Sequence, residues 1–156
     1  MSEQAYPVEL LLKHAAATPN KVWLRQPTDS GERSWTWGEA ASEIGRMAAA
    51  LQKLGLPAGS RIAITGRNTA HWFMADLAIA LAGYVSVGLY PKQAAKITQY
   101  ILEHSETQAI FIGPALDVKE LHAAVPEGIT TIAMPYAEVP GCDLDWDAMQ
   151  ADVSPI

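Results

Sequence analysis

The chain has 156 residues, which is enough for one globular domain with a substantial core. Apolar residues make up 49% of it and charged residues 18%, a balance that excludes a disordered or fibrous protein and favours a packed α/β domain. The formal net charge is −6 and no run of lysine or arginine occurs, so we expect no nucleic-acid partner.

The first part of the chain predicts a helix, a hairpin and a second helix. Residues 7–18 have helical apolar spacing, with Pro7 suited to a first turn. Residues 21–26 and 33–35 are short extended segments around a Pro/Asp/Ser/Gly turn, which suggests a small hairpin. Thr36 then begins a helix through a capping box with Glu39, and Gly55 ends it. Its predicted buried stripe is Ile44, Met47, Ala48 and Leu51.

The middle of the chain alternates between β-rich runs and helical patterns. Strands are predicted at residues 61–64, 85–89, 109–112 and 130–133, which begin 24, 24 and 21 residues apart. Each interval accommodates a strand and a crossover helix, so we predict a mostly parallel sheet with helices on both faces. The helices are expected at residues 70–81, 94–103 and 117–124.

Helical spacing also predicts which side of each crossover helix is buried. In the second helix the predicted stripe is Ile97, Tyr100, Ile101 and His104, and in the third it is Val118, Leu121 and Val125.

Residues 72–91 are the most membrane-like segment, because they approach the roughly 20 residues needed to span a bilayer. Asp76 and Gly83 interrupt the segment, and its second half is rich in β-branched residues. This pattern is typical of a buried helix followed by a buried parallel strand, so no membrane span is expected.

Residues 135–156 contain three prolines, one glycine and five acidic residues. We interpret them as a loop or linker, with one short helix near Trp146, that leads toward polypeptide not present here. Residues 1–134 are then expected to form the α/β unit.

Cys142 is the single cysteine, so an internal disulfide cannot form, and no histidine near it has metal-ligand spacing. We therefore predict no metal site. The N-terminal residues lack the charged start and unbroken apolar run of a signal peptide. Together these features predict a cytoplasmic protein.

Candidate functional residues follow the predicted strands, where α/β folds bind ligands. The turn after residue 64 contains Gly66 but none of the other glycines that a dinucleotide fingerprint requires. We therefore interpret Gly66 as the residue that allows a sharp turn, and Asn68 or Thr69 as the cap of the next helix. His71 and His104 have no adjacent nucleophile or carboxylate pattern and are expected at a helix surface or core edge. Lys92 is either a solvated loop lysine or a phosphate contact.

Residues 61–113 closely resemble the early region of AMP-forming acyl-CoA synthetases, particularly the long-chain fatty-acid type. The matching features are Asn68, Trp72, the Ala82–Gly83 step, Leu-Tyr-Pro at residues 89–91, and the helix that reads YILEHSE. Gly88 stands where relatives commonly have proline, and Lys92 where they commonly have threonine. The resemblance implies part of the N-terminal domain of the adenylate-forming fold.

In that family, a carboxylic acid attacks the α-phosphate of ATP to give acyl-AMP, and the acyl group then passes to coenzyme A. The resemblance therefore implies ATP, Mg²⁺ and coenzyme A as cofactors of the complete enzyme and a carboxylic acid, of fatty-acid type, as substrate. The Gly/Ser/Thr-rich phosphate loop, the acidic residues for magnesium and ribose, and the catalytic lysine all lie downstream in relatives. We therefore expect no catalytic residue here, no firm cofactor binding and no activity of this chain alone.

The resemblance also places Tyr90 and Lys92, and more weakly Lys119, at the edge that meets the coenzyme A nucleotide in some relatives. The alternative is that each serves packing or solubility. Expected partners are the missing C-terminal remainder and, through an exposed apolar face, a second copy.

Two other function classes stay open at this point. The chain could be a free-standing, non-catalytic α/β module that binds a ligand or partner. It could also be a nicotinamide-nucleotide enzyme, although the glycine fingerprint is missing.

Overall fold

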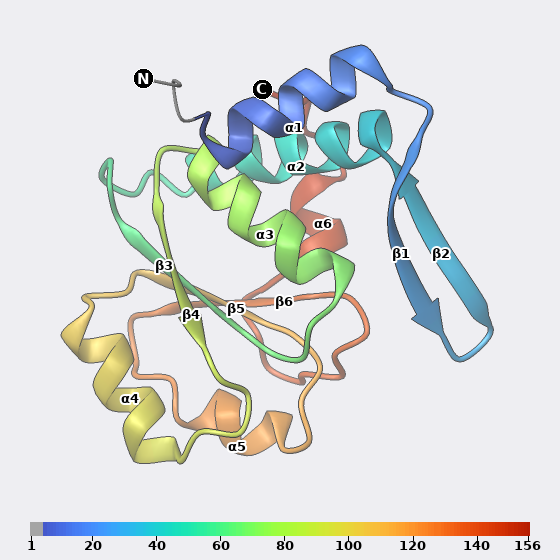
Figure 1. Cartoon of the computed structure of the whole chain (residues 1–156). Coiled ribbons are helices and arrows are strands. Elements are labelled where there is room, and N and C mark those ends of the chain that lie inside the picture. Colours follow the sequence, from blue (N-terminus) through green and yellow to red (C-terminus); the bar gives the residue numbers. More distant parts are fainter. Residues whose placement is uncertain (1–4) are drawn as a thin grey trace.

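The β-rich runs form strands and the segments with helical spacing form helices in the computed structural model, which describes residues 5–156 (Figure 1). The helices are α1 (Pro7–Ala17), α2 (Trp37–Gln52), α3 (Ala70–Leu81), α4 (Ala95–His104), α5 (Val118–Ala123) and α6 (Trp146–Gln150). The strands are β1 (Val22–Thr28), β2 (Gly31–Thr36), β3 (Arg61–Thr65), β4 (Val85–Leu89), β5 (Ala109–Ile112), β6 (Thr130–Ala133) and β7 (Leu144–Asp145).

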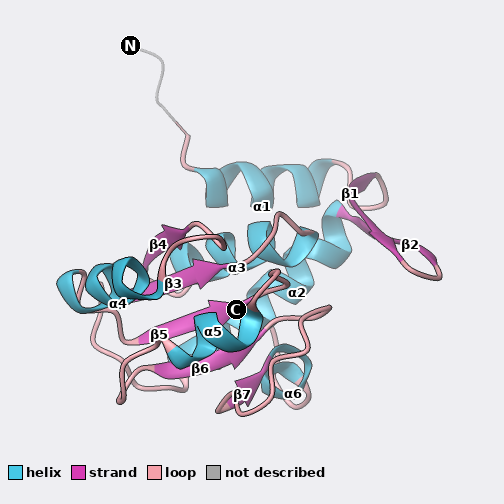
Figure 2. Cartoon of the chain, turned by 90° about the horizontal axis from the view of Figure 1, so that it is seen from below, coloured by secondary structure: helices cyan, strands magenta, loops and turns pink. Residues whose placement is uncertain are grey.

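Within the described residues, β3 to β7 make a five-stranded sheet in the order β4-β3-β5-β6-β7 (Figure 2). Every neighbouring pair is parallel, and Ile62 of β3 lies opposite Ser86 of β4 and Ala109 of β5. From β3 the chain crosses to β4 at one edge and then returns past β3 to β5. The predicted α/β class and parallel sheet are confirmed.

Helices cover both faces of this sheet and bury its central strands β3, β5 and β6, whereas most residues of the edge strand β4 are exposed. In β3, Ile62 and Ile64 face the larger apolar cluster, which includes residues of α2, α3 and α6. Ala63 faces the opposite cluster, which includes Leu102 of α4 and Leu121 of α5. Figure 1 shows α1, α2, α3 and α6 on one side of the sheet and α4 and α5 on the other.

The capping residues of α2 and α3 are those that the sequence indicates. Thr36 accepts a hydrogen bond from the Glu39 backbone N–H at 3.2 Å, and the Glu39 carboxylate accepts from the Thr36 N–H at 2.8 Å. Thr69 accepts from the Trp72 N–H at 3.2 Å, so Thr69 is the cap of α3. The predicted stripe of α2 is fully buried.

The hairpin of β1 and β2 is longer than predicted, since both strands extend into the expected turn as far as Thr28 and Gly31. Pro27 is tolerated in β1 because a two-stranded hairpin consists only of edge strands, where a missing N–H donor costs little. Gln26 anchors the hairpin, because its side-chain oxygen accepts from the Ala70 N–H at the start of α3, at 2.9 Å.

The predicted buried face of α4 is wrong in part. Ile97 is 49% exposed and Tyr100 63% exposed, whereas Thr98 and Leu102 are buried. Apolar side chains occur on both flanks of this helix, and the flank with Leu102 packs into the cluster under α4 and α5. The other flank is left facing outward.

Residues 135–156 include the short helix expected near Trp146, namely α6, and also β7, which the sequence did not indicate. Trp146 is fully buried in the larger apolar cluster. Residues 72–91 form most of α3 followed by the parallel strand β4, as expected. The expectation that this strand is buried is wrong, because β4 lies at the edge of the sheet and most of its residues are exposed. Among the described residues, no helix is both long and apolar enough to cross a membrane. The N-terminal segment, for which we expected no signal peptide, begins with four residues that lie outside the described range.

Candidate ligand-binding edge

The carboxyl ends of the parallel strands meet at one edge of the sheet, where β3 ends at Thr65, β4 at Leu89 and β5 at Ile112. β4, which follows β3 in the chain, lies on one side of β3, and β5 lies on the other side. The strand order therefore reverses at β3. Open α/β sheets bind ligands in the crevice outside the strand ends at such a reversal. The loops after β3, β4 and β5 are therefore the first candidates for a site.

The loops after β3 and β5 touch along their backbones at Gly66 and Gly113. The Gly113 N–H donates to the Thr65 carbonyl at 2.8 Å, and the Arg67 N–H donates to the Pro114 carbonyl at 2.7 Å. Gly66 has φ +130°, and a Cβ there would lie 2.7 Å from the Gly113 Cα. Gly66 thus serves the sharp turn and a close backbone approach, which fits its interpretation as a turn glycine.

A hollow of about 300 Å³ lies between the loops after β3 and β4. It is lined by Gly66, Asn68, Trp72, Gly88, Leu89, Tyr90 and Pro91. A Cβ at Gly88 would lie 3.6 Å from the Trp72 indole, so the glycine leaves a flat aromatic floor beside the strand end. Tyr90 is 79% exposed at this hollow. We call these seven residues the aromatic slot.

Lys92 lies beside the aromatic slot and not in it. It lines a smaller hollow of about 200 Å³ that shares Pro91 with the slot and has Asp117 and Glu120 on the α5 side. Lys119 is exposed on α5 and is not among the residues that line either hollow. The structure thus places Tyr90 and Lys92 at adjacent hollows and leaves Lys119 apart.

The sequence analysis missed a buried polar cluster centred on Glu43 of α2, which is only 7% exposed. Its carboxylate accepts hydrogen bonds from the indole N–H of Trp35 at 2.8 Å and from that of Trp146 at 2.9 Å. Nε2 of fully buried His71 lies 3.2 Å from the same carboxylate. We call these four residues the Glu43 cluster. The available signal was one acidic residue beside Ile44 in an otherwise small and apolar helix segment.

Burial alone would raise the pKa of Glu43, but the hydrogen bonds from His71, Trp146 and Trp35 lower it to about 2. The carboxylate is therefore ionised, and Nε2 of His71 carries the hydrogen that faces it. Nδ1 of His71 is buried without a hydrogen-bond partner among the described residues. A fully buried imidazole cannot reach a substrate, so the cluster organises the core, and His71 lies deeper than the expected core edge.

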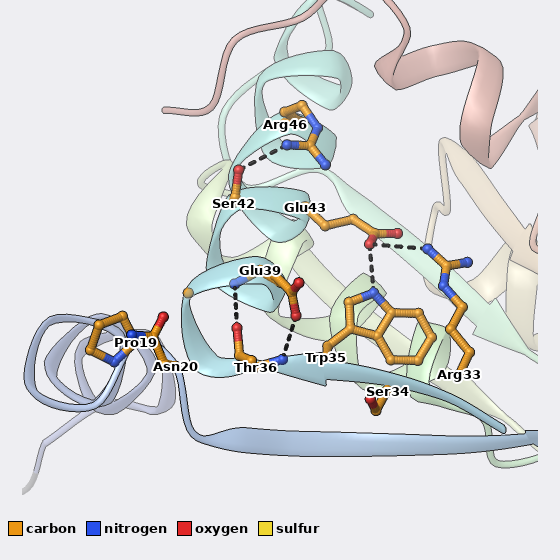
Figure 3. Close-up of a pocket in the computed structure, with 11 residues that line it drawn as sticks. Pro19, Asn20, Arg33, Ser34, Trp35, Thr36, Glu39, Ser42, Glu43 and Arg46 are labelled. Carbon is orange, nitrogen blue, oxygen red and sulfur yellow. Dashed lines mark hydrogen bonds and ion pairs between the residues drawn. The ribbon is translucent and has the colours of Figure 1, made fainter.

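A hollow of about 640 Å³ next to this cluster lies between the hairpin and α2 (Figure 3). The Arg33 guanidinium lies 4.4 Å over the Trp35 ring and 3.7 Å from the Glu43 carboxylate, and Arg46 donates to Ser42 at 2.8 Å. These polar groups already bind one another, as the dashed lines in Figure 3 show.

Metal and thiol chemistry have little support in the described residues. No group of three or more His, Cys, Asp or Glu side chains is placed to hold a metal ion in residues 5–156. The half-buried Cys142 forms no disulfide, and burial raises the pKa of its thiol, with Asp143 and Asp145 acting in the same direction.

Comparison with known proteins identifies the family. The profile of the AMP-binding enzyme family matches residues 11–153. The chain belongs to this family. The resemblance seen in the sequence is thereby confirmed, and the match extends on both sides of residues 61–113.

Two relatives of the chain are named as ligases. A fatty acid–[acyl-carrier-protein] ligase of Streptomyces coeruleorubidus is 31% identical over 79% of this chain and 24% of its own length. A long-chain-fatty-acid–CoA ligase of Mycobacterium bovis is 30% identical over 75% of this chain and 20% of its own length. The chain thus spans about a fifth to a quarter of these relatives.

A solved structure shows the same fold. The acetoacetyl-CoA synthetase of Streptomyces lividans superposes with a TM-score of 0.80 over 96% of this chain and 25% of that protein, at 24% identity. At this identity the likeness concerns the fold alone.

Proposed function

We propose that this chain is the N-terminal portion of an ATP-dependent ligase that activates a carboxylic acid, of fatty-acid type, as acyl-AMP and transfers it to coenzyme A. The observation that carries the proposal is the family match over residues 11–153, in a chain that spans only 20–24% of its ligase relatives. In this proposal residues 1–134, together with β7 and α6, are the α/β scaffold, and the C-terminal residues lead toward the remainder of a cytoplasmic enzyme.

The proposed chemistry explains why we expect this portion to be inactive alone. A carboxylate has no good leaving group, and ATP, together with Mg²⁺, would supply AMP as one. The carboxylate attacks the α-phosphate of ATP and pyrophosphate leaves. The thiol of coenzyme A then displaces AMP from the acyl carbon. The sequence contains no Gly/Ser/Thr-rich phosphate loop ending in lysine. This chain therefore shapes and supports a site whose reactive groups lie elsewhere in the polypeptide.

Within that role, we propose that the aromatic slot and Lys92 form the edge that holds the coenzyme A nucleotide. The fit rests on the shape and charge of these residues. Trp72 and Tyr90 offer aromatic surface to a purine ring, and Lys92 offers a cation to a phosphate group. Lys119, which lies apart from both hollows, is a secondary candidate.

The activity is tested by measuring pyrophosphate release with ATP, Mg²⁺ and a fatty acid. We expect none from residues 1–156 and turnover from the complete reading frame. Turnover by the 156-residue chain would show that the catalytic groups are present here. A complete reading frame that forms no acyl-AMP would remove the ligase proposal.

The coenzyme A edge is tested in the complete enzyme by Lys92→Ala and Tyr90→Ala. Each is expected to raise the KM for coenzyme A about tenfold and to leave the KM for ATP unchanged, because the contact forms only with the thiol substrate. Lys13→Ala, an exposed lysine on α1, is the control. An unchanged KM for coenzyme A in both variants would place its nucleotide elsewhere.

A further inference from the structure

The outward face of α4 carries an apolar and aromatic stripe that nothing in residues 5–156 covers. Ile97 is 49% exposed and Tyr100 63% exposed. The ring of His104 stacks on that of Tyr100, with centroids 5.4 Å apart and planes 12° from parallel. These residues lie at positions i, i+3 and i+7, the spacing by which one helix contacts another. The spacing and the exposure together indicate a contact surface.

Two opposite charges flank this stripe on the same side. Lys96 and Glu103 are seven residues apart, so they occupy the same heptad position. Lys96 has no ion pair with the described residues, and Glu103 accepts a hydrogen bond from Gln99 at 2.9 Å. A base in the first turn and an acid in the last turn oppose the helix dipole. The dipole of α4 therefore does not account for the positions of these two charges, whereas an intermolecular contact would.

We propose that this face of α4 pairs antiparallel with the same face of a second copy, about a two-fold axis near Tyr100. Antiparallel pairing aligns equivalent heptad positions in opposite directions, so Lys96 meets Glu103 of the partner subunit, and the symmetric pair forms at the other end. In a parallel arrangement this heptad position would instead face a different position of the partner, so Lys96 and Glu103 would not meet. The charge pattern is thus self-complementary in the antiparallel orientation.

The surface also sets the strength of the association. Three outward side chains on a ten-residue helix bury much less than the roughly 800 Å² per partner of a standard stable interface. The dimer is therefore expected to be weak. It forms at high protein concentration and dissociates on dilution.

Sedimentation equilibrium of the 156-residue chain, from about 20 μM to about 1 mM, tests the pairing through its charges. Lys96→Glu and Glu103→Lys are each expected to weaken association at least about tenfold, because each sets like charges opposite one another. An equimolar mixture of the two variants is expected to restore association as a heterodimer, in which both ion pairs reform. The double variant K96E/E103K is expected to restore it as well.

Lys13→Glu on α1 makes the same change of charge at another exposed site, and it is expected to associate like the unmodified chain. Circular dichroism checks that each variant is folded. A strictly monomeric unmodified chain at about 1 mM, or a mixture of the single variants that stays monomeric, would overturn the proposal. Association that ignores both charge changes would place the contact on another surface. None of these outcomes depends on the ligase activity.

Discussion

At the residue scale, Glu43 places a full negative charge inside the core of a small protein. Ionised groups are rarely buried unless hydrogen bonds replace their hydration, and here two indole N–H groups and one imidazole do so. The donors come from β2, α3 and α6, so one carboxylate holds three elements against α2. The arrangement is stabilising only while Glu43 stays ionised.

Glu43→Gln tests this dependence on charge. The pKa of Glu43 is lowered from its usual value near 4.5 to about 2, so the charge stabilises the fold above about pH 4.5, and the effect is lost as the pH falls toward 2. The shift corresponds to at most about 3 kcal/mol. We expect the variant to unfold at lower urea concentration at pH 7 and to lose less stability than the unmodified chain between pH 5 and pH 2. An unchanged pH profile would contradict the lowered pKa.

Gly66→Ala tests the backbone contact between the loops after β3 and β5. A Cβ at position 66 would meet the Gly113 backbone at 2.7 Å in a conformation, φ +130°, that alanine rarely adopts. We expect a loss of more than about 2 kcal/mol in the free energy of unfolding. Gly88→Ala is the matched control, since its Cβ would make only ordinary contacts, 3.6 Å from Trp72. Equal effects of the two changes, measured by urea denaturation, would contradict the proposed crowding.

At the element scale, α6 shows how tertiary contacts create a short helix. Five residues are too few for an isolated helix to form in water. Asp145 caps α6 by accepting from two backbone N–H groups, and Trp146 fixes it to the core through burial and the bond to Glu43. The helix therefore depends on residues about 100 positions earlier in the chain.

Trp146→Phe tests the polar part of this attachment. The change keeps an aromatic ring in the core but removes the N–H that Glu43 accepts. We expect a loss of about 1–3 kcal/mol in the free energy of unfolding and earlier amide exchange in α6. Trp23→Phe is the control, because the Trp23 ring is partly buried in the same cluster and its indole N–H makes no hydrogen bond in the described chain. A Trp146→Phe variant as stable as the control would contradict the role of the N–H.

The elements that could be predicted from the sequence are those specified by local patterns. The bounds of β4, β5 and β6 match the runs predicted, because short runs of β-branched and other apolar residues are typical of strands. The capping pair of Thr36 and Glu39 likewise needs only four residues of sequence. Local chemistry was sufficient in these cases.

The features that could not be predicted depend on contacts between distant segments. β7 has two residues and is a strand only because Leu144 and Asp145 pair with β6. The outward face of α4 could not be chosen from spacing, because both of its flanks carry apolar residues. The Glu43 cluster joins positions 35, 43, 71 and 146, which no local motif connects. At the strand ends, the order of β4, β3 and β5 brings Gly66 and Gly113 together.

At the scale of the whole molecule, the sheet lies between two apolar clusters and belongs to both. Neighbouring residues of β3 point into opposite clusters, Ile62 and Ile64 to one and Ala63 to the other. Loss of either helix layer would expose one face of every central strand. The two layers are therefore expected to unfold together.

Equilibrium unfolding in urea tests this coupling. The five tryptophans all belong to the cluster on the α2 and α3 side, so their fluorescence reports that layer, whereas far-UV circular dichroism reports the helices of both layers. We expect the two transitions to have the same midpoint and slope. A separate circular dichroism transition without a change in fluorescence would show that α4 and α5 unfold independently.

The Glu43 cluster also determines what a cut in the backbone would do. Three of its residues, at positions 35, 43 and 71, come from the first half of the sequence, and Trp146 comes from near the C-terminus. The exposed loop around Leu116 lies between these two parts of the chain. A protease that nicked this loop would produce two polypeptides, each still holding part of the same set of hydrogen bonds. The pieces would remain assembled in native buffer and separate only in denaturant, so the two parts of the chain behave as complementary halves of one fold.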